Sequence, residues 1–304
     1  PTAELCNGLD DDGDGEFDED FPVGIPCSTG GVGVCRASGQ YLCTPDQTWV
    51  LCAVTQPGQP PTPLDTACNG LDDDCDGEVD EEAFGEMVAV TSGPASFVID
   101  RYEASRPDAS AAEQGSLQSR ACSKPGALPW TSVTWQAAAA ACAASGKRLC
   151  SASEWQAACQ GPQLHTYPYG FAFDPEACNG EDLDPDCSGD DDDRILPAGT
   201  ACGCPPPSAS LCASTAGALD LSGNAAEWTA TMSGGPDERQ IRGGAFDSQA
   251  PALTCTFDRF ALPLDSFRPT LGFRCCAATE PTPSHLFRNG FEAGSTAAWS
   301  ATVP

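Results

Sequence analysis

Two acidic segments of the chain repeat each other and place carboxylates where they could bind a metal ion. The first, CNGLDDDGDGEFDE, runs from Cys6 to Glu19, and the second, CNGLDDDCDGEVDE, runs from Cys68 to Glu81. The register is kept over all fourteen positions, at an offset of 62 residues. Each segment is too polar to bury, and its seven carboxylates repel one another and oppose closing of the loop. We therefore expect a cation in each folded loop.

The order of the side chains favours calcium. In each copy, carboxylates at alternate positions precede a glycine that permits a tight turn, and a carbonyl position and further acids follow, as in the front of an Asp-x-Asp-x-Asp-Gly calcium loop. The bidentate Glu of an EF-hand is missing, because Phe21 and Ala83 stand at its position. Zinc is disfavoured because the loops hold no His and no paired thiolates. The predicted ligands are Asp10, Asp12, Asp14, Glu16, Asp18, Glu19, Asp72, Asp74, Asp76, Glu78, Asp80 and Glu81.

The alternative interpretation of these segments is a solvated acidic linker without metal, since runs of like charge are often disordered. The spacing that recurs intact in both copies favours calcium over that alternative. The pattern also resembles a Cys/Asp-rich metal-binding repeat common in bacterial surface proteins. That resemblance implies a protein of the bacterial cell surface.

The composition is typical of an exported protein. Nineteen cysteines and only two histidines fit an oxidising compartment and a disulfide framework better than thiolate metal sites. The formal net charge of -30 argues against binding to nucleic acid or to anionic membranes. No apolar run approaches ~20 residues, so we expect no membrane span. The sequence begins at Pro1 rather than Met, which we interpret as a mature or trimmed product without its export signal.

Amino-acid composition and charge divide the chain into three parts. Residues 1–84 form an irregular acidic module with a single base, Arg36, and we expect calcium and disulfides to stabilise it. Residues 85–278 predict a loop-rich α+β domain, and residues 279–304 form a separate tail. The tail contains apolar residues that either fold back on the domain or dock onto a partner. Docking into a neighbouring copy would make the protein a homo-oligomer or a surface assembly such as a filament.

Cysteines should hold the acidic module together, because it is too small and too polar to fold by burial alone. Cys68 and Cys75 are expected to bridge across the second loop. Gly13 replaces the second of these cysteines in the first copy, so Cys6 pairs elsewhere or stays unpaired. Four more cysteines lie close together between the loops: Cys27, Cys35, Cys43 and Cys52.

Three elements can be predicted in the second part. The run from 96 to 102 indicates a strand, and the Ala-rich run from 135 to 145 indicates a buried helix. A second helix should run from Ser151 through Cys159, because Ser-x-x-Glu at its start is a capping box.

Five short motifs follow one another in this part of the chain. They are Gly146-Lys-Arg-Leu with Glu154-Trp155 after it, Tyr167-Pro-Tyr-Gly170, Ser222-Gly-Asn-Ala-Ala-Glu-Trp228, Arg242-Gly-Gly244 and Gly272-Phe-Arg274. Together they resemble the formylglycine-generating enzyme (sulfatase-modifying factor) family, over about residues 88–277. Any one motif is weak, but five in this order are specific. The resemblance implies a loop-rich relative of the C-type lectin fold.

The resemblance also implies disulfides and calcium ligands. Two family disulfides would correspond to Cys142–Cys275 and Cys159–Cys255, and the partners of the other cysteines in this part are not assigned by the sequence. The family binds calcium structurally through side chains and main-chain carbonyls, although an acidic surface insertion is the alternative here. The implied ligands are Asn179, Gly180, Asp193 and Ile195 at one site, and Asp220, Leu221, Gly223 and Ala225 at another.

One departure from the family bears directly on function. The enzyme holds copper through two cysteines shortly after the Arg-Gly-Gly motif, but Ser248 and Leu253 stand near those positions here. A hydroxyl and an isobutyl group cannot bind Cu(I), which needs soft sulfur ligands. Cys255, the one thiol nearby, is better explained as a disulfide partner. The oxidase activity is therefore expected to be absent, and no other catalytic constellation is visible.

Three functions remain open. The first is a non-catalytic, calcium-binding extracellular structural protein, such as a fibre or adhesin subunit. The second is a lectin-like module that binds a glycan or a protein, with residues 245–269 as the binding face. The third is a copper-dependent formylglycine-generating oxidase with displaced cysteines. Fold-level analogy alone cannot choose between the first two.

Overall fold

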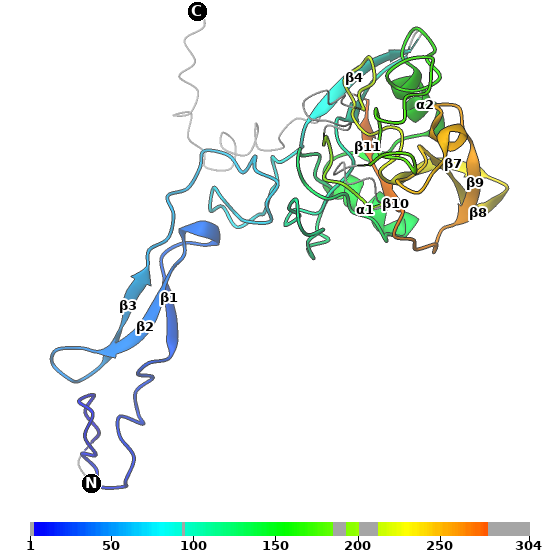
Figure 1. The fold of residues 1–304 in the computed structure, drawn as a ribbon. Helices are drawn as coiled ribbons and strands as arrows, with labels where there is room; N and C mark the ends of the chain where they lie inside the picture. The colour runs from blue at the N-terminus through cyan, green and yellow to red at the C-terminus, as the bar shows by residue number, and fades with distance from the viewer. Residues whose placement is uncertain (1–2, 93–94, 185–192, 201–211, 279–304) are drawn as a thin grey trace, which may run out of the picture. The chain divides into compact units, whose positions relative to one another are not determined.

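The structure, a computed structural model, divides into two compact units (Figure 1). The first unit comprises residues 1–65 and 71–80, and the second comprises residues 66–70 and 81–304. No helix among the described residues is long and apolar enough to cross a membrane. The predicted tail and Cys187, Cys202 and Cys204 lie outside the residues that the structure describes, which are 3–92, 95–184, 193–200 and 212–278.

The first unit is built on a small antiparallel sheet. Its strands are β1 (Pro26–Thr29), β2 (Ala37–Cys43) and β3 (Val50–Gln56), in the order β1-β2-β3, with a 3₁₀ helix η1 (Gly33–Cys35) between the first two. Residues along β2 alternate between half-buried and exposed, and few side chains of the sheet are fully buried. Apolar burial contributes little, so covalent links must restrict this unit.

Three disulfides cross the first unit and use all four cysteines between the loops. Cys27–Cys52 joins the outer strands, and Cys6–Cys43 ties the first acidic loop to the end of β2. The predicted bridge between Cys68 and Cys75 is wrong, because the bridges formed are Cys35–Cys75 and Cys68–Cys122. The physical reason is that the chain passes from the second unit to the first between residues 70 and 71, so the two cysteines belong to different units.

The described residues of the second unit form two four-stranded sheets and two α-helices. One sheet has the order β4-β5-β11-β6 and the other has the order β10-β7-β8-β9, in which only the pairing of β10 with β7 is parallel. The elements are β4 (Met87–Ser92), β5 (Ala95–Asp100), α1 (Trp135–Ala144), β6 (Arg148–Leu149), α2 (Ala152–Gln160), β7 (Ala226–Ser233), β8 (Gly235–Arg242), the 3₁₀ helix η2 (Ala250–Leu253), β9 (Arg259–Pro263), β10 (Leu271–Phe273) and β11 (Cys275–Ala277).

Both predicted helices are confirmed, and their sequences explain their ends. Thr134 caps α1, its hydroxyl accepting from the Ala137 N–H. Ser151 and Glu154 form the reciprocal capping box of α2. The predicted strand at 96–102 is present as β5, which starts one residue earlier and ends at Asp100.

Disulfides join the two helices to residues near the end of the domain, and one of them joins α1 to strand β11. The two pairings implied by the resemblance, Cys142–Cys275 and Cys159–Cys255, are confirmed. The next residue, Cys276, bridges to Cys150. Successive side chains of a strand point to opposite faces, so the adjacent cysteines of β11 reach partners on different elements. A further bridge between described residues of this unit joins Cys178 to Cys212.

Candidate metal centres

The first acidic loop is held closed by its own aspartates. The N–H groups of Gly13 and Gly15 donate to the two carboxylate oxygens of Asp10, at 2.6 and 3.0 Å. Both glycines have a positive φ, so the tight turn needs them. This turn brings the oxygens of Asp10, Asp12 and Asp14 within 4.8 Å of one another, as the alternate spacing predicts.

The second loop repeats this geometry. The Gly77 N–H donates to Asp72 Oδ2 at 3.1 Å, as the Gly15 N–H does to Asp10 in the first copy. Oxygens of Asp72, Asp74 and Asp76 also lie within 4.8 Å of one another. Asp72 is buried, and its Oδ1 has no hydrogen-bond partner in the described part of the chain. Each copy therefore gathers three carboxylates around one point.

The other predicted loop ligands are not members of these two triads. Asp18 caps the start of the first loop, where it accepts from the Asn7 and Gly8 N–H groups. Asp80 is buried and its N–H donates to Asp65. Glu19 joins a different group, with Glu4 and Asp12. Glu16 and Glu78 belong to none of the acidic groups that the described residues form. Glu81 lies in the second unit.

Two acids outside the repeat support the loops and were missed by the sequence analysis. Glu4 accepts from the Asp11 and Asp12 N–H groups, and Asp65 accepts from the Asp80 N–H at 2.6 Å. Burial raises the pKa of Asp65 to about 6, the hydrogen bonds from the backbone of Asp80 and Asp73 opposing the rise. The sequence marks these acids only by their place: Glu4 stands two residues before Cys6, and Asp65 stands three residues before Cys68.

The first site implied by the resemblance is partly assembled. The Asn179 side-chain amide donates to the Arg194 carbonyl at 2.9 Å, so Asn179 contacts the segment that holds Asp193 and Ile195. It also donates to Asn224 Oδ1 at 2.8 Å. Gly180 follows Asn179 and is buried. The structure thus brings these implied ligands into one region.

The second implied site surrounds a buried acid. Asp220 is buried and its Oδ2 accepts from the Gly199 N–H at 2.6 Å. Burial raises the pKa of Asp220 to about 6, against the lowering effects of that hydrogen bond and of the Arg274 charge. The Ala225 N–H donates to Glu103, whose pKa burial also raises, with the charges of Asp220 and Glu227 adding to the rise. Leu221 and Gly223, the other implied ligands, are buried. Glu103 gave no signal in the sequence beyond its place after a strand.

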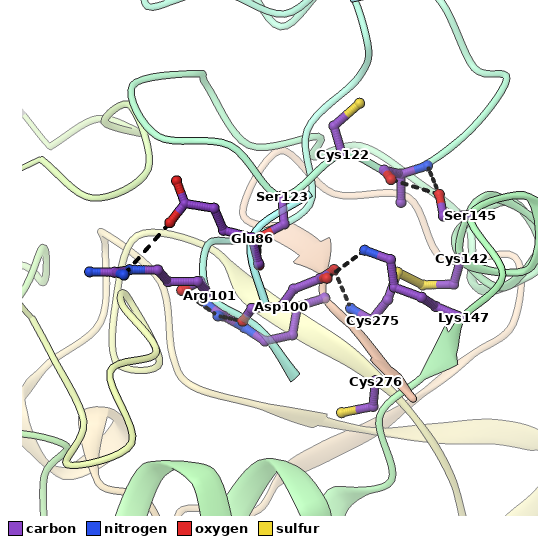
Figure 2. A network of polar contacts seen from close by, with 12 residues as sticks. Glu86, Asp100, Arg101, Cys122, Ser123, Cys142, Ser145, Lys147, Cys275 and Cys276 are labelled. Atoms are coloured by element: carbon purple, nitrogen blue, oxygen red, sulfur yellow. Dashed lines mark hydrogen bonds and ion pairs between the residues drawn. A yellow bond between two sulfur atoms is a disulfide. The ribbon is translucent and has the colours of Figure 1, made fainter. Parts of the chain in front are cut away.

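Residues of the family motifs form a buried ionic network. Lys147 Nζ lies 2.6 Å from Asp100 Oδ1, and neither side chain is exposed (Figure 2). The other oxygen of Asp100 accepts from the Cys275 N–H at 3.0 Å. Arg274 and Glu227 form a second fully buried pair at 2.9 Å. Because charges buried this deeply need partners, these motif residues hold the sheets together rather than face a substrate.

The position that would hold copper is filled by a hydroxyl and an isobutyl group. Ser248 and Leu253 are both buried against Gly244, where an added Cβ would lie 3.0 Å from Leu253 and 3.3 Å from Ser248. The Ser248 hydroxyl accepts from the Ala245 N–H at 2.9 Å. Every cysteine that the structure describes is disulfide-bonded, including Cys255. This donor set does not fit Cu(I).

The second unit is a loop-rich α+β domain in which disulfides and buried ion pairs join two sheets and two helices. Among its described residues, no cysteine carries a free thiol beside the Arg-Gly-Gly motif. Residues 76–279 match the model of the sulfatase-modifying factor enzyme 1-like domain. The chain belongs to this formylglycine-generating enzyme–sulfatase family, as the motifs predicted.

Curated relatives include the inactive C-alpha-formylglycine-generating enzyme 2 of Mus musculus, 32% identical over 161 residues, and that of Bos taurus, 31% identical over 169 residues. The matches cover 50% and 52% of this chain and 49% and 53% of the relatives, so the chain spans about half of their length. Both relatives are named inactive.

Solved structures that match the chain include CarF, with a TM-score of 0.43, and PvdO from Pseudomonas aeruginosa, with a TM-score of 0.41. Each is 16% identical to this chain, and the alignments cover 64% and 63% of it and 96% and 90% of those chains.

Proposed function

We propose that the chain is a non-catalytic, calcium-binding extracellular protein that serves as a structural or adhesive subunit of a bacterial surface. The observation that carries the proposal is the burial of Ser248 and Leu253 where the family places its copper-binding cysteines. The eight disulfides among the described residues fit a secreted or extracellular protein. The names of the curated relatives agree with a loss of catalysis.

Electrostatics support calcium in the two loops. Two unit charges less than 5 Å apart repel by about 1 kcal/mol in water and by about 4 kcal/mol near a protein surface. Three such pairs exist in each triad, and residues 1–84 contain one base, Arg36. A divalent cation converts this repulsion into attraction, and oxygen donors alone are the ligands that calcium prefers.

Calcium removal and an activity assay test the proposal together. Excess chelator should lower the melting temperature and increase hydrogen exchange in the first unit before the second, since metal binding is linked to folding. Incubation with copper, oxygen and a cysteine-containing sulfatase peptide should give no formylglycine. Turnover in that assay would favour the oxidase interpretation. An unchanged melting curve in chelator would contradict the proposed calcium binding.

A partly exposed aromatic group, in which Tyr167 is buried and Phe171 is exposed, favours ligand binding as a second candidate function. Tyr167 and Tyr169 stack at 5.5 Å between ring centroids, and Phe173 packs against Tyr167 at 5.6 Å. Phe171 is 64% exposed. The Tyr167 hydroxyl donates to the Ala250 carbonyl, which places these rings next to the predicted face at 245–269. Aromatic faces in this position suit a glycan or a protein, and glycan-array binding that Phe171→Ala abolishes would establish this function.

Self-assembly is the remaining part of the proposal. A structural subunit should form a homo-oligomer or filament, which light scattering and electron microscopy of the native particle would detect. A monomer at all concentrations would leave the calcium-stabilised adhesin without self-assembly.

A further inference from the structure

Glu4 is a buried acid that lies ahead of the repeat. It is 6% exposed, and its Oε1 accepts from the Asp11 N–H at 2.7 Å and from the Asp12 N–H at 3.2 Å. Its other oxygen, Oε2, is buried and makes no hydrogen bond to any described residue. A buried carboxylate oxygen without a donor is costly, so this oxygen indicates a missing partner.

The surroundings of Glu4 indicate that this partner is a cation. Oxygens of Glu4, Asp12 and Glu19 lie within 4.8 Å of one another. All three groups are acids, so none of them can donate to the others when ionised. Arg36 is the only base among residues 1–84, and no ion pair joins it to these acids in the part of the chain that the structure describes.

Asp12 belongs to two groups of ligands at once. Its carboxylate lies with Asp10 and Asp14 in one triad and with Glu4 and Glu19 in the other. A carboxylate has two oxygens and can bridge two ions. The two triads together contain five carboxylates, so a single divalent ion would leave a net charge of -3, whereas two ions would leave -1.

We propose that the first loop binds two divalent cations of the calcium class, one held by Asp10, Asp12 and Asp14 and one held by Glu4, Asp12 and Glu19, with Asp12 as the bridge. This inference rests on the proposed calcium binding of the loops and adds a second ion and a ligand from outside the repeat. Thr66 stands at the repeat offset from Glu4, so the second copy does not contain the same residue.

Counting the bound calcium ions of the full chain tests the inference. Native mass spectrometry and equilibrium dialysis should show one ion fewer per chain for Glu4→Gln and one ion fewer for Asp14→Asn. The double variant should lose two ions, because the two changes affect different ions. If one shared ion served both triads, the double variant would lose no more than each single variant, and the inference would be wrong.

The variant is chosen to preserve the fold. The side-chain carbonyl of glutamine can still accept from the Asp11 and Asp12 N–H groups. Peptide mapping of the Cys6–Cys43 disulfide checks that the Glu4→Gln variant folds correctly. Glu19→Gln gives the same reading from the exposed side of the triad if Glu4→Gln fails to fold. Glu176→Gln, an exposed acid of the second unit, is the matched control and should keep the full count.

The experiment separates the two proposals. A wild-type chain that binds no calcium would overturn both the proposed calcium function and the second ion. If the wild-type chain binds calcium and melts earlier in chelator, the proposed calcium function stands. If the Glu4→Gln and Glu19→Gln variants then bind as many ions as the wild-type chain, the second ion alone would be overturned.

Discussion

Replacing Lys147 with methionine should destabilise the second unit by about 3–5 kcal/mol at neutral pH. Lys147 and Asp100 form a 2.6 Å ion pair, and both side chains are fully buried (Figure 2). Methionine fills most of the volume of the lysine stem but leaves the Asp100 carboxylate buried without its counter-charge. The loss is large because a buried charge without a partner costs far more than an exposed ion pair gains.

The pH dependence of this loss gives an internal test. Burial raises the pKa of Asp100, and Lys147 opposes that rise. Without the lysine the pKa of Asp100 in the folded state rises further above its unfolded value. An acid with a raised folded pKa contributes stability below its unfolded pKa and loses it as pH rises through the folded pKa. The penalty of Lys147→Met should therefore be smaller at about pH 4 than at about pH 7.

Guanidinium unfolding of the oxidised protein, followed by tryptophan fluorescence, measures the penalty. Arg148→Met is the matched control, because the Arg148 side chain is half exposed in its pair with Glu154 and should contribute about 1 kcal/mol or less. Adding Asp100→Leu to Lys147→Met should recover part of the loss, although the Cys275 N–H then lacks its acceptor, at about 1–3 kcal/mol. A loss below about 1 kcal/mol at neutral pH, or an equal loss at both pH values, would refute the reasoning.

Three further predictions concern the metal centres. The Asp74→Asn, Asp76→Asn variant should reproduce locally the hydrogen-exchange increase caused by chelation, and unchanged exchange in the second loop would contradict this. In excess chelator, the unfolding free energy of the first unit should fall by up to about 3 kcal/mol as pH rises from about 4 to 6, because burial raises the pKa of Asp65 from 3.8 to about 6. In denaturant titrations, Asp65→Asn should reduce this dependence of the unfolding free energy on pH. Ser248→Cys, Leu253→Cys should bind Cu(I) in a competition assay with a chromogenic chelator, whereas the wild-type chain should not.

The sequence predicted the second unit well where chemistry is local. The helix capped by Ser151 and Glu154 needs only neighbouring residues, and it is present as predicted. The pairing of Cys142 with Cys275 followed from the family resemblance and is also present. Partners distant in sequence and outside any motif were not predictable. Glu103 contacts the Ala225 N–H across more than a hundred residues, and no local pattern announces that contact.

In the acidic module, a local sequence pattern led to a wrong prediction of a disulfide. Cys68 and Cys75 flank one loop and suggest a local bridge, yet Cys75 bridges to Cys35. The Asp72 backbone explains this pairing, because its carbonyl accepts from the Val34 N–H and fixes the second loop against the 3₁₀ helix η1. Repetition in sequence therefore predicted the local geometry of each loop but not the position of each loop in its unit.

The motifs that define the family report its fold and not its chemistry. Lys147, Glu227 and Arg274 come from three different motifs, and all three side chains are buried in ion pairs that join strands and loops. Any chain with this arrangement needs them whether or not it binds copper, because removing one partner leaves a buried charge. Ser248 and Leu253 occupy positions that such packing does not constrain to cysteine. A match to the motifs thus assigns the fold, and activity has to be judged at those two positions.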